Sequence, residues 1–187
     1  YHTDKKGFLV WQDMVPGDFG GNSLNTSAMD AGTEKNRTYL SANNFMNEWT
    51  DIMNYLMFFQ SIIICIPFNE GSGQFNTTEI VTETKKIDSS RLIDSASGGN
   101  YRNCGDILDF HSYPAPNYKP NDNLNTSNYI NVIGEYGGLA LEIKQHTWND
   151  NIYGYKKLKS KDEITSFYDQ FIDKLVAYSK IGISGAI

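Results

Sequence analysis

The stretch of sequence that decides the fold is SIIICIPFNEGSGQ, residues 61–74. Its apolar run from Ile62 to Phe68 has the composition of a buried strand, and it ends abruptly on Asn69 and Glu70 before a glycine-rich segment. A carboxylate at the end of a buried segment costs free energy unless a partner or a task retains it there. Glu70 is therefore a candidate functional residue.

Apolar runs with strand character alternate with helical patterns along the chain. We expect strands at residues 7–11, 62–68, 91–94, 106–110, 129–133 and 181–187, and helices at 42–57, 77–86 and 160–175. Nearly continuous apolar strands separated by helices are typical of a parallel sheet that is covered on both faces. Polar groups gather just past the C-terminal ends of these strands, so the pattern predicts a doubly wound sheet or a (β/α) barrel.

Composition excludes several classes of function. The chain has 187 residues and a net charge of −6, which fits one domain or a piece of a larger one and argues against binding nucleic acid through phosphate contacts. The basic segment from Lys156 to Lys161 is interrupted by uncharged residues, and we expect it to be a solvated loop. The longest apolar run is too short to cross a membrane, so no membrane association is expected. Cys65 and Cys104 stand alone without a CxxC motif, and no HExxH occurs, so neither a zinc site nor any cofactor is expected.

A second glutamate stands in the same setting as Glu70. In the sequence VIGEYGG, Glu135 also follows an apolar run and precedes glycines, where a ligand can approach the backbone closely. Two converging carboxylates are what cleavage of a glycosidic bond requires, one to protonate the leaving oxygen and one to attack or stabilise the anomeric carbon. The alternative is that both glutamates are solvated or cap nearby helices.

Two further residues are candidates for the same site. Tyr113 ends the strand before that of Glu135, and its hydroxyl could donate a hydrogen bond to the Glu135 carboxylate; the alternative is an aromatic residue of the core. Asn69 could contact a sugar hydroxyl, or it could simply cap a turn.

Six motifs, taken in order, resemble the catalytic domain of glycoside hydrolase family 2, the family of β-galactosidases, β-glucuronidases and β-mannosidases. They are GFLVWQDM, IPFNEGSGQ, RLIDSASGGN, GDILDFHSYP, VIGEYGGL and HTW, and they extend over nearly the whole chain. The likeness is closest to a bacterial branch of the family. Ser72 stands where that branch usually carries tryptophan, so an aromatic wall beside Glu70 is expected to be missing.

The resemblance implies a retaining double displacement with no cofactor. Glu70 would be the general acid/base and Glu135 the nucleophile, while Asn69 would contact the sugar 2-hydroxyl and Tyr113 would hydrogen-bond the nucleophile. The residues expected to line the sugar site, by their positions, are His111, Asp13 and Trp148. The implied ligand is a β-glycoside or oligosaccharide.

The resemblance also implies the fold class α/β, as an incomplete (β/α)8 TIM barrel. Residues 1–187 would form one partial barrel that contains its third to eighth strands, and β-sandwich domains would precede it in the parent protein. We therefore expect the chain alone to have open sheet edges and little or no activity. Localisation stays open from the sequence, with a periplasmic or extracellular place in a bacterium favoured.

Two other functions are left open by the sequence. The first is a carbohydrate-binding barrel that has lost catalysis, which the serine at position 72 favours and the retention of both glutamates disfavours. The second is a metal hydrolase that uses Glu70, Glu135 and Asp13 as carboxylate ligands, which loss of activity on chelation would support.

Overall fold

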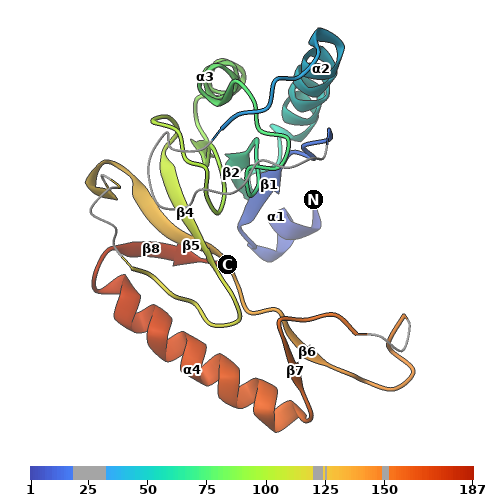
Figure 1. The fold of residues 1–187 in the computed structure, drawn as a ribbon, viewed down its shortest axis with the longest axis vertical. Coiled ribbons are helices and arrows are strands. Elements are labelled where there is room, and N and C mark those ends of the chain that lie inside the picture. Colours follow the sequence, from blue (N-terminus) through green and yellow to red (C-terminus); the bar gives the residue numbers. More distant parts are fainter. Residues whose placement is uncertain (19–32, 120–123, 125, 149–151) are drawn as a thin grey trace. The chain divides into compact units, whose positions relative to one another are not determined.

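The structure is a computed structural model that describes residues 1–18, 33–119, 124, 126–148 and 152–187. The chain divides into two compact units. The first unit comprises Tyr1–Asp109 and Pro120–Ile130, and the second comprises Phe110–Lys119 and Asn131–Ile187. The described residues form four α-helices and eight strands, and the strands belong to three small parallel sheets (Figure 1).

The first unit contains a three-stranded sheet with the order β1-β2-β3. Its elements are α1 (His2–Lys6), β1 (Val10–Asp13), α2 (Tyr39–Leu56), β2 (Ile62–Ile66), α3 (Thr77–Ile87) and β3 (Leu92–Ile93), followed by the first half of β4 (Ile107–Ser112) and a short 3-10 helix (Thr126–Asn128). Both strand pairs are parallel, with Asp13 beside Ile66 in the first pair and Cys65 beside Ile93 in the second. This register brings the C-terminal ends of the three strands to the same edge of the sheet.

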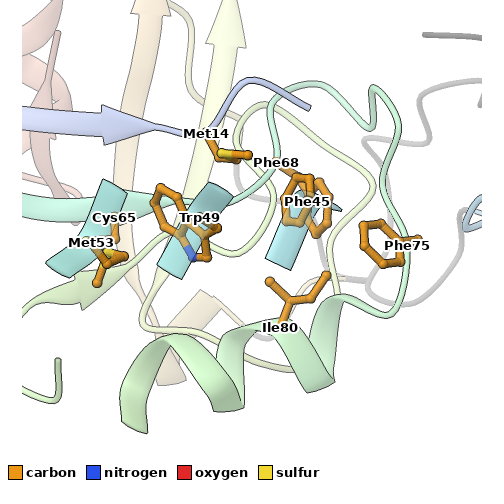
Figure 2. Packing of buried hydrophobic residues seen from close by; sticks show 8 residues of the cluster. All are labelled: Met14, Phe45, Trp49, Met53, Cys65, Phe68, Phe75 and Ile80. Atoms are coloured by element: carbon orange, nitrogen blue, oxygen red, sulfur yellow. Dashed lines mark hydrogen bonds between the residues drawn. The ribbon is translucent and has the colours of Figure 1, made fainter. Parts of the chain in front are cut away.

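Helix α2 supplies most of the core of this unit. The helix begins where the Thr38 hydroxyl accepts a hydrogen bond from the backbone N–H of Ser41, and its buried residues Phe45, Trp49 and Met53 recur every four positions. They pack with the other members of one apolar cluster, which are Met14, Cys65, Phe68, Phe75 and Ile80 (Figure 2). The Phe45 and Phe68 rings stack with centroids 5.2 Å apart. This cluster anchors the segment that leads from β2 into Glu70.

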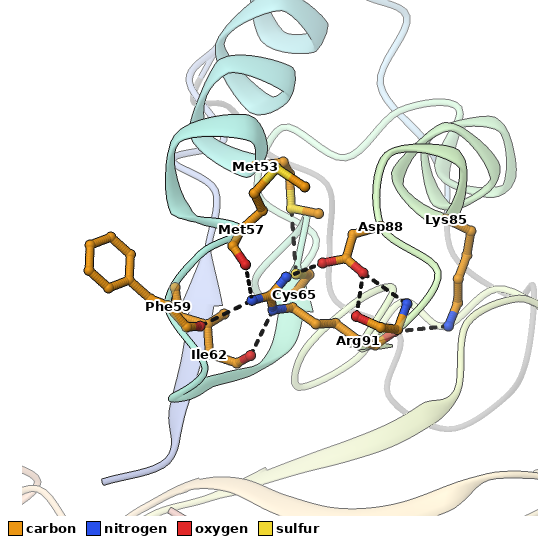
Figure 3. Close-up of polar contacts among 9 residues, drawn as sticks. Met53, Met57, Phe59, Ile62, Cys65, Lys85, Asp88 and Arg91 are labelled. Carbon is orange, nitrogen blue, oxygen red and sulfur yellow. Dashed lines mark hydrogen bonds and ion pairs between the residues drawn. The ribbon is translucent and has the colours of Figure 1, made fainter. Parts of the chain in front are cut away.

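A buried arginine joins the end of α2 to the sheet. Arg91 donates to the backbone carbonyls of Met57, Phe59 and Ile62, at 2.8, 3.0 and 2.7 Å, and forms an ion pair with Asp88 (Figure 3). A planar guanidinium with five donors can satisfy this many acceptors at once, which a lysine cannot. Arg91 therefore stabilises the turn between α2 and β2.

The second unit is built around the sheet β4-β5-β8. Its elements are the second half of β4, β5 (Ile130–Tyr136), β6 (Leu139–Leu141), β7 (Lys156–Leu158), α4 (Lys161–Ser179) and β8 (Ile183–Ala186). Tyr118, Ile133 and Ile183 form its buried cluster, against which Leu175 and Tyr178 of α4 pack. The expected cap of α4 is confirmed, because Ser160 accepts from the Glu163 N–H at 3.2 Å. The Glu163 carboxylate in turn accepts from the N–H of Lys159 at 2.7 Å.

The prediction of a (β/α)8 TIM barrel, even an incomplete one, is wrong. The strands of the described residues form separate sheets of three, three and two strands, and none of the sheets closes on itself. A barrel needs every strand to pair on both sides with a constant stagger. The ladder of the first sheet instead ends at β3, which is only two residues long, and β4 pairs in a different sheet.

Two local expectations also need correction. The first strand runs from Val10 to Asp13 rather than over residues 7–11, because Gly7 adopts a left-handed conformation that ends α1. Part of the segment from Lys156 to Lys161, expected to be a solvated loop, forms β7 and pairs with β6, with Leu158 buried. In the described part of the chain, no helix has the length and apolar character that crossing a membrane requires.

Candidate functional site

Glu70 lies in a tight turn just beyond the end of β2. Its backbone adopts a left-handed conformation, with φ of 52°, and Gly71 follows with φ of 67°. Such a conformation costs a residue other than glycine on the order of 1 kcal/mol, so it persists only where surrounding contacts fix it. Two contacts do so: the Glu70 N–H donates to the Ser97 carbonyl at 2.8 Å, and the Ser72 N–H donates to the Asn69 carbonyl at 3.0 Å. The half-buried Glu70 side chain is thus carried by a constrained turn.

Asn69 presents an unsatisfied polar atom beside Glu70. Its backbone forms an isolated bridge with Ser97, while its side-chain Oδ1 is buried and has no hydrogen-bond partner among the described residues. A buried acceptor without a donor costs about 1–3 kcal/mol. A ligand hydroxyl could remove that cost by donating to this oxygen.

Glu135 lies near the end of β5 in the second unit, with two polar neighbours from the end of β4. The Tyr113 hydroxyl donates to its Oε2, the hydrogen bond that the sequence led us to expect. His111 Nδ1 lies 3.6 Å from the same oxygen, and the His111 side chain is only 5% exposed. Glu135 itself is half-buried. A carboxylate held in this way is oriented, and its negative charge is stabilised by the phenol donor.

The sequence did not single out Tyr155, which supports Tyr113. The two phenol rings stack with centroids 4.0 Å apart and an angle of 15° between their planes. Gly138, with φ of 65°, lies directly beneath Tyr155, and a Cβ there would come within 2.5 Å of the ring. The Tyr155 N–H also donates to the Gly138 carbonyl at 2.9 Å. The second glycine of the EYGG motif was the available signal, since it marks a close approach of another residue.

Asp13 and Trp148, the other two residues expected to line the sugar site, are both exposed. Asp13 lies at the C-terminal end of β1 in the first unit and is exposed. Trp148 lies between β6 and β7 in the second unit, and its side chain is fully exposed. An indole with this exposure packs against no other side chain. Glu135, Tyr113 and His111 therefore do not hold Trp148 in place.

Three buried polar residues of the first unit were also missed. Ser97 donates from Oγ to Asp109 Oδ2 at 2.9 Å, and Asp94 is completely buried. The motif RLIDSASGGN contains Asp94 and Ser97, but neither stands at a spacing that marks a known site. For Asp94 and Ser97, a polar run directly after a short apolar strand was the only signal, whereas Asp109 lies inside β4.

The chemistry that these groups can perform is proton transfer and nucleophilic attack by carboxylates. His111 Nδ1 and Glu135 Oε2 could also ligate a metal ion, because imidazole nitrogen and carboxylate oxygen are common ligands. No protein-family model matches the chain, and a search of curated proteins finds no significant match. The residues themselves therefore carry the functional argument.

Proposed function

We propose that the intact protein is a retaining β-glycosidase related to glycoside hydrolase family 2. Glu70 acts as the general acid/base and Glu135 as the nucleophile, on a β-glycoside or oligosaccharide. The observation that carries the proposal is the hydrogen bond from Tyr113 to Glu135. A carboxylate nucleophile must be ionised and aimed at the anomeric carbon, and a phenol donor on one oxygen favours both.

The turn at Asn69 and Glu70 supports the other half of the reaction. A general acid/base has to be held so that it meets the leaving oxygen, and the backbone of Glu70 is fixed by Ser97. The buried Oδ1 of Asn69 is suited to accept a hydrogen bond from a sugar hydroxyl. We assign this hydroxyl to position 2 of the sugar, where such a contact strengthens in the transition state.

The reaction then proceeds in two steps. In the first, Glu135 forms a bond to the anomeric carbon as the bond to the leaving oxygen breaks, and Glu70 gives its proton to that oxygen. In the second, Glu70 removes a proton from water as the water oxygen attacks the anomeric carbon, and the bond to Glu135 breaks. Both carboxyl groups return to their starting states, and the sugar keeps its configuration.

Trapping of the glycosyl-enzyme tests this assignment. The intact protein is incubated with 2,4-dinitrophenyl 2-deoxy-2-fluoro derivatives of β-galactose, β-glucuronate and β-mannose, and peptides are mapped by mass spectrometry. We expect one of these reagents to add a fluorosugar to Glu135 and to abolish hydrolysis. Glu135→Gln should take up no label, whereas the matched control Glu142→Gln, at an exposed glutamate just after β6, should be labelled normally.

Two other outcomes would contradict the proposal. Sugar binding without label or hydrolysis would indicate a carbohydrate-binding protein. Hydrolysis that is lost on treatment with EDTA and restored by a divalent metal ion would indicate a carboxylate-based metal hydrolase.

A further inference from the structure

Ser97 connects the backbone of Glu70 to a buried carboxylate. Its carbonyl accepts from the Glu70 N–H at 2.8 Å, and its own N–H donates to the Phe68 carbonyl at 2.9 Å. Its hydroxyl donates to Asp109 Oδ2 at 2.9 Å. Ser97 is 4% exposed and Asp109 1%, so these contacts are shielded from water. Hydrogen bonds to a charged acceptor in such surroundings are among the stronger ones in proteins.

The turn that carries Glu70 depends on this connection. Glu70 holds a positive φ that a residue other than glycine adopts only under constraint. The bond from its N–H to Ser97 is a direct constraint on that conformation. If Ser97 shifted, the peptide of Glu70 could relax, and its carboxyl group would lose its fixed direction.

Asp109 is itself held in place. The Tyr101 hydroxyl donates to the Asp109 backbone carbonyl, and Tyr101 is 2% exposed. The completely buried Asp94 lies close enough to interact with the charge of Asp109. Burial and the neighbouring charge of Asp109 raise the pKa of the Asp94 carboxyl, which favours its protonated form. Asp109 and Ser97 are thus a buried polar support for the turn.

We propose that Ser97 and Asp109 are positioning residues for Glu70, acting through the backbone hydrogen bond between Ser97 and Glu70. The inference rests on the proposed function for the meaning of Glu70, because positioning serves proton transfer to the leaving oxygen. Neither residue needs to touch the substrate. Their removal should affect steps that need a proton from Glu70 more than steps that do not.

The test compares Ser97→Ala with Ser95→Ala in the intact protein. Ser95 is also buried, two residues earlier in the same segment, and serves as a matched control for loss of a buried hydroxyl. The first measurement is hydrogen exchange of the Glu70 amide by NMR, which needs no substrate. We expect protection of this amide to fall about 10-fold or more in Ser97→Ala and to stay near the wild-type value in Ser95→Ala.

The second measurement is kcat/KM on methyl and 2,4-dinitrophenyl glycosides of the sugar that the protein accepts. Dinitrophenolate leaves without being protonated, whereas the leaving oxygen of a methyl glycoside must receive a proton from the general acid. Ser97→Ala should therefore lose roughly 10-fold more activity on the methyl glycoside than on the dinitrophenyl glycoside. Ser97→Thr, which keeps a hydroxyl, should restore part of the loss.

The outcomes separate this inference from the proposed function. Unchanged protection of the Glu70 amide in Ser97→Ala overturns the inference, whatever the activity. Equal losses on both glycosides overturn it as well. A wild-type protein that hydrolyses no glycoside overturns the proposed function, and amide exchange then still decides whether Ser97 holds Glu70. If Ser97→Ala does not fold, Asp109→Asn, which keeps the side-chain shape, undergoes the same measurements under the same criteria.

Discussion

The rings of Tyr113 and Tyr155 lie nearly parallel with centroids 4.0 Å apart, and the hydroxyl of Tyr113 donates to Glu135. Tyr155 precedes β7, whereas Tyr113 follows β4, so the stack ties two separate segments of the second unit together. The hydroxyl of Tyr113 can hold Glu135 only if its own ring is held. Tyr155 supplies that support from the face of the ring.

Replacement of Tyr155 should therefore weaken catalysis without contacting the nucleophile directly. Aromatic pairs contribute about 0.5–1.5 kcal/mol beyond the area that they bury, which corresponds to a loss of roughly 2- to 13-fold in kcat for Tyr155→Ala. Tyr155→Phe keeps the stacked ring and should remain near wild type. Tyr39→Ala, at an 83% exposed ring of α2, is the control. Equal kcat values for Tyr155→Ala and wild type would show that the stack has no such role.

The stereochemistry of the products should identify the roles of the two glutamates. Proton NMR of early hydrolysis should show the β-anomer first, since a double displacement retains configuration. In Glu70→Ala, azide should restore turnover and give the β-glycosyl azide, because it attacks the glycosyl-enzyme in place of activated water. In Glu135→Gly, azide should attack the substrate directly and give the α-glycosyl azide. If Glu70→Ala gave the α-glycosyl azide and Glu135→Gly gave the β-glycosyl azide, the roles of the two residues would be exchanged.

Local signals in the sequence predicted three of the four helices of the described residues, all but α1, and most of the strands. The helix expected at 42–57 is α2 (Tyr39–Leu56), because apolar residues at helical spacing fix both its existence and its buried face. The helix expected at 77–86 is α3, and the N-cap at Ser160 is present. The expected hydrogen bond from Tyr113 to Glu135 is also found. All of these depend on residues close in sequence or at neighbouring strand ends.

The arrangement of the strands into sheets was not predictable in this way. The strand character of residues 91–94 does not predict that the first sheet ends with the two-residue strand β3 (Leu92–Ile93). Strand pairing depends on partners that are distant in the sequence. The pairing of β6 with β7 was missed for the same reason, since Lys156 and Lys157 are exposed and carry no apolar signal. Tyr155 and Ser97 were missed because their importance comes from contacts with residues that are distant in sequence.

Arg91 should be one of the residues of the first unit on which stability depends most. Arg91→Ala leaves three backbone carbonyls without this donor and removes the ion-pair partner of Asp88, whose carboxylate still accepts from Ser90. We expect a loss of about 3–5 kcal/mol in the free energy of unfolding. Arg91→Lys keeps the charge but not the planar fork, so its free energy of unfolding should lie between those of wild type and Arg91→Ala. Lys86→Ala breaks an exposed ion pair with Glu83 and should cost at most about 0.5 kcal/mol. Urea unfolding followed by circular dichroism measures all three, and a loss for Arg91→Ala no larger than that for Lys86→Ala would contradict this account.

The two cysteines, Cys65 and Cys104, should differ sharply in reactivity. Burial raises the pKa of the Cys65 thiol to about 11, and its sulfur packs 3.5 Å from that of Met53. The thiolate is the reactive form, so Cys65 should resist 5,5′-dithiobis(2-nitrobenzoic acid) at pH 8. Cys104 is partly exposed, and we expect one thiol to react in the native protein and two in urea. Cys104→Ser should show no fast thiol; rapid reaction of that variant would mean that Cys65 is accessible.

Asp94 should make the protein less stable as the pH rises. Burial, and then the charge of the neighbouring Asp109, raise the pKa of the Asp94 carboxyl well above its ordinary value, and Asp13 adds in the same direction. The folded state therefore holds a proton that the unfolded state has already released above about pH 4. From that pH up to the raised pKa, this group lowers the free energy of unfolding by up to about 1.4 kcal/mol per pH unit. Above the raised pKa, the contribution no longer changes.

Asp94→Asn removes this ionisation while keeping the shape of the side chain. We expect the free energy of unfolding of the variant, relative to wild type, to increase as the pH rises from about 4 toward the raised pKa, because the wild-type protein loses stability over this range and the amide does not. Asp51→Asn, at an exposed position of α2, should show no such trend. The comparison uses the pH dependence of the difference in the free energy of unfolding. It is therefore valid even if the asparagine amide packs less well and lowers stability by a constant amount at every pH. Parallel curves for wild type and Asp94→Asn would mean that Asp94 ionises as readily in the folded protein as in the unfolded chain.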